Sequence, residues 1–116
     1  MKYFTLDEFD CPSLPNSGKN MDTNFLTKLE EAREIAGVPF KITSGYRTKE
    51  HNEAVGGVVN SSHIIGVAAD IAVSSGSERY IILNALLKAG FKRIGVAKTF
   101  IHCDTDPNKS NSVWTY

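Results

Sequence analysis

The sequence predicts a single α+β domain, in which a small, largely antiparallel sheet is flanked by helices. Three observations predict this class. Two long segments carry apolar residues at helical spacing, several short segments alternate apolar and polar residues like strands, and the last two strand-like segments are close enough to form a hairpin. At 116 residues the chain suits one domain, spanning residues 1–116.

The first expected elements are helical. Thr5 and Glu8 have the spacing of a capping box, which predicts a short helical turn. The best-supported helix is expected over residues 22–36, where Asp22 can cap the start and Gly37 follows the end. The stretch between these two elements holds two prolines and a glycine, so we expect an irregular loop there.

The rest of the chain alternates between strand and helix patterns, and apolar spacing assigns each segment. In order, we expect a strand over 40–43, a short helix over 48–54, a buried strand over 68–73, a helix over 77–89 capped by Ser77, and strands over 93–97 and 100–105.

Composition excludes some functions. The 13 basic and 13 acidic residues cancel and are interspersed, so the chain has no electrostatic footprint for nucleic acid or an anionic membrane. The first ten residues carry acids and no apolar run, which predicts no membrane insertion and a protein that is cytoplasmic as synthesised. Cys11 and Cys103 are expected to be free thiols in that compartment.

Strand periodicity places several polar side chains together. In the strand over 68–73, Asp70 projects opposite to its apolar neighbours, and His102 and Asp104 share one face of the last strand. If these strands lie near one another, His63 from the preceding loop can complete a metal site. Taken singly, a loop histidine is more often a hydrogen-bonded surface residue, and a strand aspartate more often caps a turn.

The combined pattern resembles a known family. Residues 61–70 match the S-x-H-x-x-G-x-A-x-D pattern of the M15 peptidases, the D-alanyl-D-alanine carboxypeptidase and endolysin family. The resemblance to its short, phage-like branch extends over most of the chain, through Tyr3–Asp10, Ser44–Thr48, His51–Gly57, Ile101–Asp104 and Trp114. It implies the fold shared by the hedgehog domain and the DD-peptidases.

The resemblance also implies a site. His63, Asp70 and His102 would bind Zn²⁺ and leave a fourth position for water, which the metal would activate toward an amide carbonyl. Arg47 would contact the substrate or the oxyanion, and Ser61 would lie beside the site as a substrate-binding residue or hold the His63 loop.

The resemblance also bears on residues around the site. His51 and Asn52 are expected to brace the site. Many members of the family place an acid three residues before the last histidine, or a histidine two before it, but here Thr99 and Phe100 occupy those positions. Asp104 is therefore the candidate general base, or alternatively the carboxylate that orients His102.

The resemblance implies a zinc metallopeptidase, of carboxypeptidase or endopeptidase type, acting on peptidoglycan stem peptides or cross-links. The phage-like form implies a phage lysis pore or a virion as the partner that delivers it to the cell wall. Two alternatives remain: a non-catalytic zinc-binding structural or virion module, favoured by the missing acid, and another zinc hydrolase such as an amidase.

Overall fold

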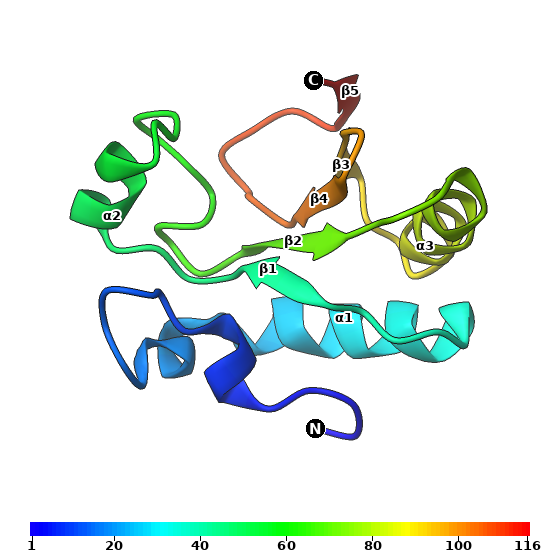
Figure 1. Ribbon diagram of the computed structural model, residues 1–116, viewed down its shortest axis with the longest axis horizontal. Coiled ribbons are helices and arrows are strands. Elements are labelled where there is room, and N and C mark those ends of the chain that lie inside the picture. Colours follow the sequence, from blue (N-terminus) through cyan, green and yellow to red (C-terminus); the bar gives the residue numbers. More distant parts are fainter.

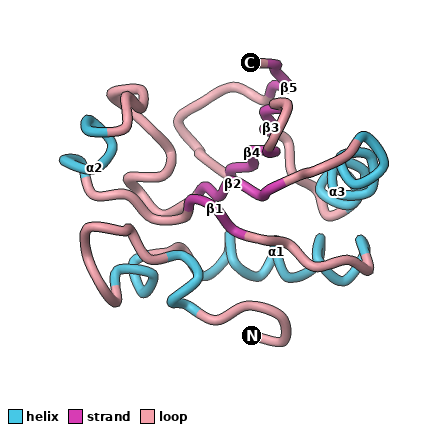
Figure 2. The backbone as a smooth tube through the Cα atoms, viewed as in Figure 1, coloured by secondary structure: helices cyan, strands magenta, loops and turns pink.

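A computed structural model describes residues 1–116 and shows a five-stranded sheet with three helices (Figures 1 and 2). The helices are α1 (Thr23–Ala36), α2 (Lys49–Ala54) and α3 (Gly76–Lys88). The strands are β1 (Ile42–Ser44), β2 (Ala68–Ala72), β3 (Arg93–Val96), β4 (Phe100–Asp104) and β5 (Ser112–Thr115), and two 3₁₀ turns, η1 (Leu6–Phe9) and η2 (Ser17–Asn20), precede α1.

The strand order is β1-β2-β4-β3-β5. β1, β2, β4 and β3 are antiparallel to their neighbours, and only β5 runs parallel to its neighbour β3. The expected α+β class with a largely antiparallel sheet is therefore confirmed, including the β3–β4 hairpin. β2 and β4 lie side by side in the middle of the sheet, which is where the candidate site forms.

Local signals explain most helix boundaries. Asp22 accepts a hydrogen bond from the Phe25 backbone N–H at 2.9 Å, as expected for the residue that begins α1. The prediction for α3 was displaced by two residues, because Ser75 and not Ser77 caps the helix by accepting from the Glu78 N–H. The loop expected before α1 contains η2, a turn that sequence spacing did not indicate.

Alternation along the strands separates the core from the site. Ala69 and Ile71 of β2 and Ile101 and Cys103 of β4 are buried on one face of the sheet, within the hydrophobic core. α1 and α3 pack against each other and supply apolar side chains to that core (Figure 1). The opposite face of β2 and β4 is left for polar side chains.

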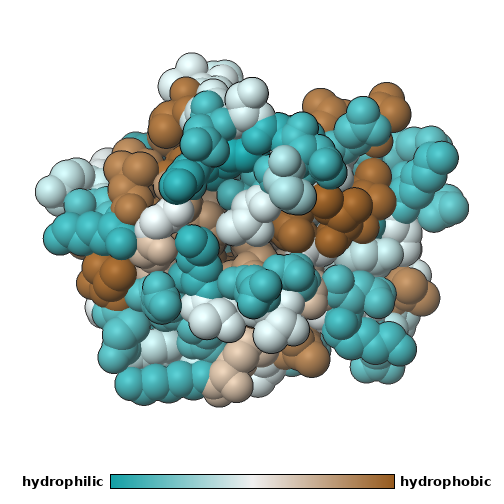
Figure 3. All heavy atoms as spheres, turned by 180° about the vertical axis from the view of Figure 1, so that it is seen from behind, coloured by the Kyte–Doolittle hydropathy of each residue, from teal (hydrophilic) through white to brown (hydrophobic).

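The rear face of the molecule carries separate apolar groups. In the rear view, brown groups are divided by hydrophilic side chains (Figure 3). None of the helices has the length and apolar character required to span a bilayer. Both cysteines are buried free thiols, and Cys103 belongs to the core.

Candidate metal centre

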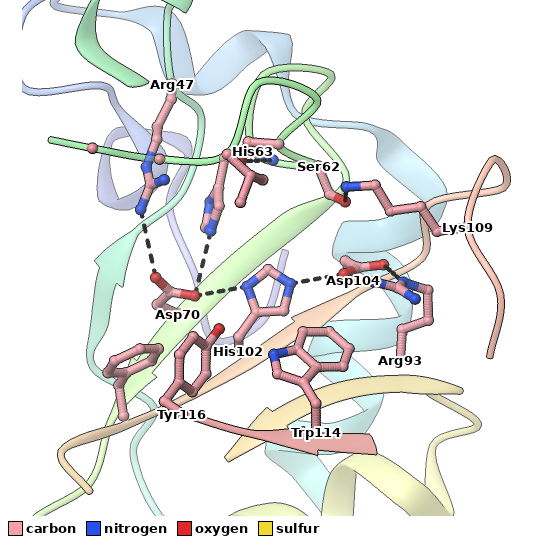
Figure 4. A pocket seen from close by; sticks show the side chains of 15 residues that line it. Arg47, Ser62, His63, Asp70, Arg93, His102, Asp104, Lys109, Trp114 and Tyr116 are labelled. Atoms are coloured by element: carbon pink, nitrogen blue, oxygen red, sulfur yellow. Dashed lines mark hydrogen bonds and ion pairs between the residues drawn. The ribbon is translucent and has the colours of Figure 1, made fainter. Parts of the chain in front are cut away.

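The register of the two central strands brings two predicted ligands together. Asp70 of β2 is directly opposite His102 of β4, so their side chains project from the same face of the sheet. Asp104, two residues further along β4, projects from that face as well. The arrangement expected from strand periodicity is therefore present (Figure 4).

His63 reaches the same place from the loop that precedes β2. Gly66 turns this loop with a φ of 74°, a conformation that favours glycine. A Cβ at that position would lie 2.3 Å from the Asn20 carbonyl oxygen, because the loop packs closely on η2. The Gly66 carbonyl also accepts the Asp22 N–H at 2.8 Å, which fixes the loop to the start of α1.

The three side chains form a compact donor set. One ligand atom from each of His63, Asp70 and His102 lies within 4.8 Å of the others, and all three residues are buried. Asp70 Oδ1 is 3.3 Å from His63 Nε2 and 2.9 Å from His102 Nδ1. Two imidazole nitrogens and one carboxylate facing an open position are the usual ligands of a catalytic zinc ion, so the residues fit that metal.

Hydrogen bonds on the far side of each imidazole orient it for this role. His63 Nδ1 is 2.8 Å from the Gly45 carbonyl oxygen, which can only accept, so Nδ1 carries the proton and Nε2 is free to bind a metal. His102 is turned the other way. Its Nε2 donates to Asp104 Oδ2 at 2.7 Å, and its Nδ1 faces the donor set.

The charges of the cluster depend on one another. Burial alone would raise the pKa of Asp70, but the hydrogen bond from His102 and the neighbouring His63 imidazole outweigh it and hold that pKa far below its usual range. Burial opposes charge on His102 in the same way, yet hydrogen bonds to Asp104 and Asp70 raise its pKa. Without a metal, the doubly protonated imidazole of His102 is therefore favoured more strongly than in an ordinary histidine.

Asp104 is tied by three donors. Its Oδ2 accepts from His102, and its Oδ1 accepts from Arg93 Nε at 2.8 Å and from the Asp106 N–H at 3.0 Å. The side chain is only 1% exposed. Burial would raise the pKa of Asp104, but these bonds, led by the one from His102, lower it.

Arg47 faces the carboxylate oxygen of Asp70 that the two histidines do not contact. Three neighbours fix its guanidinium. Nε donates to Ser44 Oγ at 3.1 Å, Nη1 donates to Asn52 Oδ1 at 3.2 Å, and Nη2 is 3.7 Å from Asp70 Oδ2. Asn52 is buried and also donates to the Val58 carbonyl at 2.7 Å. Asn52 thus joins Arg47 to the loop that borders the cavity.

The serines before His63 hold its loop. Ser61 is buried, lines the cavity and accepts the His63 N–H at 3.2 Å. Ser62 donates to Asp106 Oδ2 at 2.7 Å and accepts from Lys109 Nζ at 3.1 Å. The His63 loop is therefore attached to the segment that follows β4.

The structure does not bring His51 to the cavity. His51 lies on α2, and its backbone N–H bonds to Thr48 Oγ1 at 3.1 Å as part of the helix cap. It is not among the residues that line the cavity. Of the two residues expected to brace the site, Asn52 alone contacts a residue there.

β5 brings an aromatic side chain to the site, at a position that the sequence did not predict. Trp114 is aligned with Gly95 of β3, which is aligned in turn with His102 of β4. A Cβ on Gly95 would lie 2.6 Å from Trp114 Nε1, so glycine makes room for the indole. The indole lies 5.5 Å from the His102 ring, and the Arg93 guanidinium covers it at 4.8 Å.

These groups surround a cavity of about 410 Å³. Fifteen residues line it: Arg47, Gly56, Gly57, Val58, Ser61, Ser62, His63, Asp70, Arg93, Phe100, His102, Asp104, Lys109, Trp114 and Tyr116. The candidate donor atoms of His63, Asp70 and His102 lie between Arg47 on one side and the aromatic side chains of Trp114 and Tyr116 on the other (Figure 4). The cavity is large enough for a short peptide segment.

Several lining residues were not found by sequence reasoning, although one left a readable signal. Counting back from a hairpin turn at residues 97–100 pairs Arg93 with Asp104, as the structure shows. Ser62, Lys109 and Tyr116 left no comparable signal, because their positions depend on how distant loops and β5 pack.

A buried cluster of two histidines and one aspartate, set in a cavity beside a fixed arginine, is typical of metal-dependent hydrolases. The model of the family described as Peptidase M15 matches residues 2–104. The chain belongs to the M15 peptidase family, whose members are zinc-dependent.

Comparison of structures gives the same fold. The crystal structure of the L-Ala D-Glu endopeptidase ChiX of Serratia marcescens is similar, with a TM-score of 0.51 and 19% sequence identity. The similarity covers 61% of this chain and 62% of that chain, so it spans less than two thirds of ChiX. A search of curated protein sequences finds no match.

Proposed function

We propose that the protein is a zinc-dependent peptidase that hydrolyses peptide bonds in the stem peptides or cross-links of peptidoglycan. The observation that carries the proposal is the buried His63–Asp70–His102 donor set, which opens on a cavity bordered by Arg47. Membership of the M15 family and the fold shared with the L-Ala D-Glu endopeptidase ChiX support it. Carboxypeptidase and endopeptidase action both fit this geometry.

His63, Asp70 and His102 would hold the zinc ion. When bound, Zn²⁺ supplies Lewis acidity and lowers the pKa of a coordinated water toward neutrality. The chain's own residues then provide position and charge. Arg47 presents a fixed cation beside Asp70, where it suits a substrate carboxylate or a developing oxyanion, and Ser61 holds the His63 loop and borders the substrate space.

For Asp104 the geometry favours the orienting role over the general base. Both of its oxygens already accept hydrogen bonds, and its pKa is lowered, so it is a poor acceptor for another proton. The bond to His102 Nε2 fixes the ring so that Nδ1 faces the metal position. We therefore propose Asp104 as the residue that orients His102.

A non-catalytic zinc-binding module is the second candidate, and one observation favours it. The positions that carry an acid or histidine in many M15 enzymes hold Thr99 and Phe100, and Asp104 is fully engaged. Against this, a purely structural zinc site usually has a fourth protein ligand, whereas here an open cavity faces the three ligands. Delivery to the wall by a lysis pore or a virion remains a prediction.

One experiment separates the candidates. Zinc-loaded protein is incubated with purified peptidoglycan of several chemotypes, with and without a chelator, and the released ends are identified by mass spectrometry. His63→Ala is the inactive reference, and His51→Ala is the matched control because His51 lies outside the cavity.

We expect new peptide ends that disappear with the chelator and with His63→Ala, and that persist with His51→Ala. The chemical identity of these ends shows which bond is cleaved. It distinguishes a carboxypeptidase, an endopeptidase and an amidase. Stoichiometric zinc binding with no cleavage of any chemotype would instead support the non-catalytic module.

A further inference from the structure

Tyr116 stands at the rim of the candidate metal centre, outside the residues that the family model matches. We propose that the Tyr116 hydroxyl donates a hydrogen bond to the carbonyl oxygen of the scissile peptide bond as that oxygen gains negative charge. The inference rests on the proposed peptidase function and deepens it by assigning a catalytic role to the residue that follows β5.

The sheet brings Tyr116 to the site. β5 pairs with β3 so that Trp114 is aligned with Gly95, on the face that carries His102. Tyr116 follows Trp114 by two residues and therefore projects from the same face. Its ring packs against Phe100 of β4 with centroids 5.0 Å apart, which holds the side chain beside the cavity.

The direction of the hydroxyl is visible in the close view. It points from the lower rim toward the space between Asp70 and His102, whereas Arg47 approaches Asp70 from the opposite side (Figure 4). A peptide carbonyl lying over the ligand atoms would thus have the guanidinium on one side and the phenol on the other. Two donors converging on one oxygen are the usual arrangement of an oxyanion hole.

Several other polar groups of the cavity are already engaged. Asp104 accepts three hydrogen bonds, and Ser62 and Lys109 bond to each other. The Arg93 guanidinium is held by Asp104 and by the Ser110 carbonyl. Tyr116 is 70% exposed, and the indole N–H of Trp114 can only donate to its hydroxyl, so the phenol keeps its own proton for a substrate.

The electrostatic surroundings keep this phenol protonated. Burial of its hydroxyl end raises the pKa of Tyr116, and the negative charges of Asp70 and Asp104 raise it further against the opposing effects of Trp114 and Arg47. A neutral phenol is a hydrogen-bond donor, which is the role that an oxyanion requires.

The reaction balances without transferring a proton to or from Tyr116. In the addition step, a bond forms between the water oxygen and the carbonyl carbon, the carbonyl π electrons move to the carbonyl oxygen, and the water proton leaves to solvent. In the second step, the negative oxygen re-forms the carbonyl double bond, the C–N bond breaks with its electron pair going to nitrogen, and the nitrogen takes a proton from solvent. Tyr116 stabilises the negative oxygen between these steps.

The test uses Tyr116→Phe, which keeps the ring on Phe100 and removes the hydroxyl alone. Tyr80→Phe is the matched control, because Tyr80 is 69% exposed on α3 and does not line the cavity. Turnover of purified muropeptides gives kcat and KM, chelator competition gives zinc affinity, and calorimetry gives the affinity for phosphinate analogues of alanyl-alanine and alanyl-glutamate.

We expect Tyr116→Phe to lower kcat by about 100-fold, as when one oxyanion donor is lost, with KM and zinc affinity close to wild type. The tetrahedral phosphinates should bind more weakly by a similar factor, and Tyr80→Phe should match wild type. Equal kcat and equal phosphinate affinity would overturn the inference and leave the peptidase function standing. If the wild-type protein cleaves nothing, the proposed peptidase function is wrong, and phosphinate affinity alone tests the role of Tyr116. Equal affinities of the wild type and Tyr116→Phe, or no binding by either protein, would then overturn the inference about Tyr116.

Discussion

His102 and Asp104 behave as one unit within β4. Asp104 accepts the Nε2 proton of His102, and Arg93 and a backbone N–H hold the carboxylate in turn. Carboxylates that support a metal-ligating histidine fix its tautomer and raise its basicity. The unit thus determines which nitrogen faces the metal.

Asp104→Asn tests this unit. The substitution keeps the size of the side chain and removes its charge, so we expect zinc affinity to fall by about 10–100-fold, measured by chelator competition. At saturating zinc, kcat should remain near wild type. A large loss of kcat with unchanged zinc affinity would instead identify Asp104 as the general base, and Asp7→Asn, at an exposed position, is the control.

Zinc binding should depend on pH through His102. Zinc requires the unprotonated Nδ1, whereas Asp104 and Asp70 raise the pKa of the metal-free imidazole. As the solution is acidified, zinc affinity should therefore begin to fall while the pH is still above about 6.5, the ordinary pKa of an imidazole. The charged form of His102 stabilises the metal-free fold below that value, and this stabilisation is lost as pH rises through the raised pKa. Zinc titrations at a series of pH values measure the midpoint of the fall in zinc affinity. A midpoint below about pH 6.5 would contradict this account.

Residue spacing could place some of the site but not all of it. Strand alternation predicted Asp70, His102 and Asp104 on one face if their two strands lie near one another, and the structure pairs those strands and places the residues there. His63 depended on the family resemblance, since nothing in a loop's sequence states where it folds. The link from Ser62 to Asp106 joins residues 44 positions apart, and local patterns cannot reveal such a contact.

At the level of elements, β5 depends on one glycine. Gly95 lets the Trp114 indole lie over β3, beside His102. Because a Cβ there would collide with the indole, Gly95→Ala should displace Trp114 and with it the position of Tyr116. The side chain of His102 would lose its aromatic cover.

We expect Gly95→Ala to lower kcat/KM for muropeptides by at least about 10-fold, the effect of shifting a positioned group by a fraction of an ångström or more. Fluorescence of Trp114, the single tryptophan, should shift to longer wavelength. Gly76→Ala is the control, because a Cβ at the start of α3 meets only the Arg79 side chain, at an ordinary contact distance of 4.0 Å. An unshifted spectrum with normal kcat/KM would show that the indole position does not matter.

The elements themselves were largely predictable. α1 has regular apolar spacing with a cap and a stop, and the β3–β4 hairpin follows from its short turn. β5 escaped prediction because four exposed or half-exposed residues carry no core pattern, and its parallel pairing requires a long connection from β4. The α3 start was misplaced because Ser75 and Ser77 are both good caps, and packing decides between them.

At the level of the whole molecule, the metal should stabilise the fold. The donor set joins β2, β4 and the His63 loop, so zinc binds the folded chain in preference to the unfolded one. At about 1,000 times its Kd, zinc would add about 4 kcal/mol. Chelation should therefore lower Tm by about 10–20 °C for a domain of this size.

Differential scanning calorimetry with and without chelator measures this shift. His51→Ala should retain the chelator-dependent shift and His63→Ala should remove it, because His63 belongs to the donor set and His51 does not. A chelator-dependent shift that persists in His63→Ala would place the stabilising metal elsewhere.

β2 and β4 each carry the core on one face and the donor set on the other. Deleting or inserting a single residue within either strand would exchange the two faces, burying the carboxylates and exposing Ile71 or Ile101 to the cavity. Such a length change would damage folding and metal binding together. Variation in length is therefore expected to accumulate in the exposed 55–60 loop, and these two strands should change only by substitution.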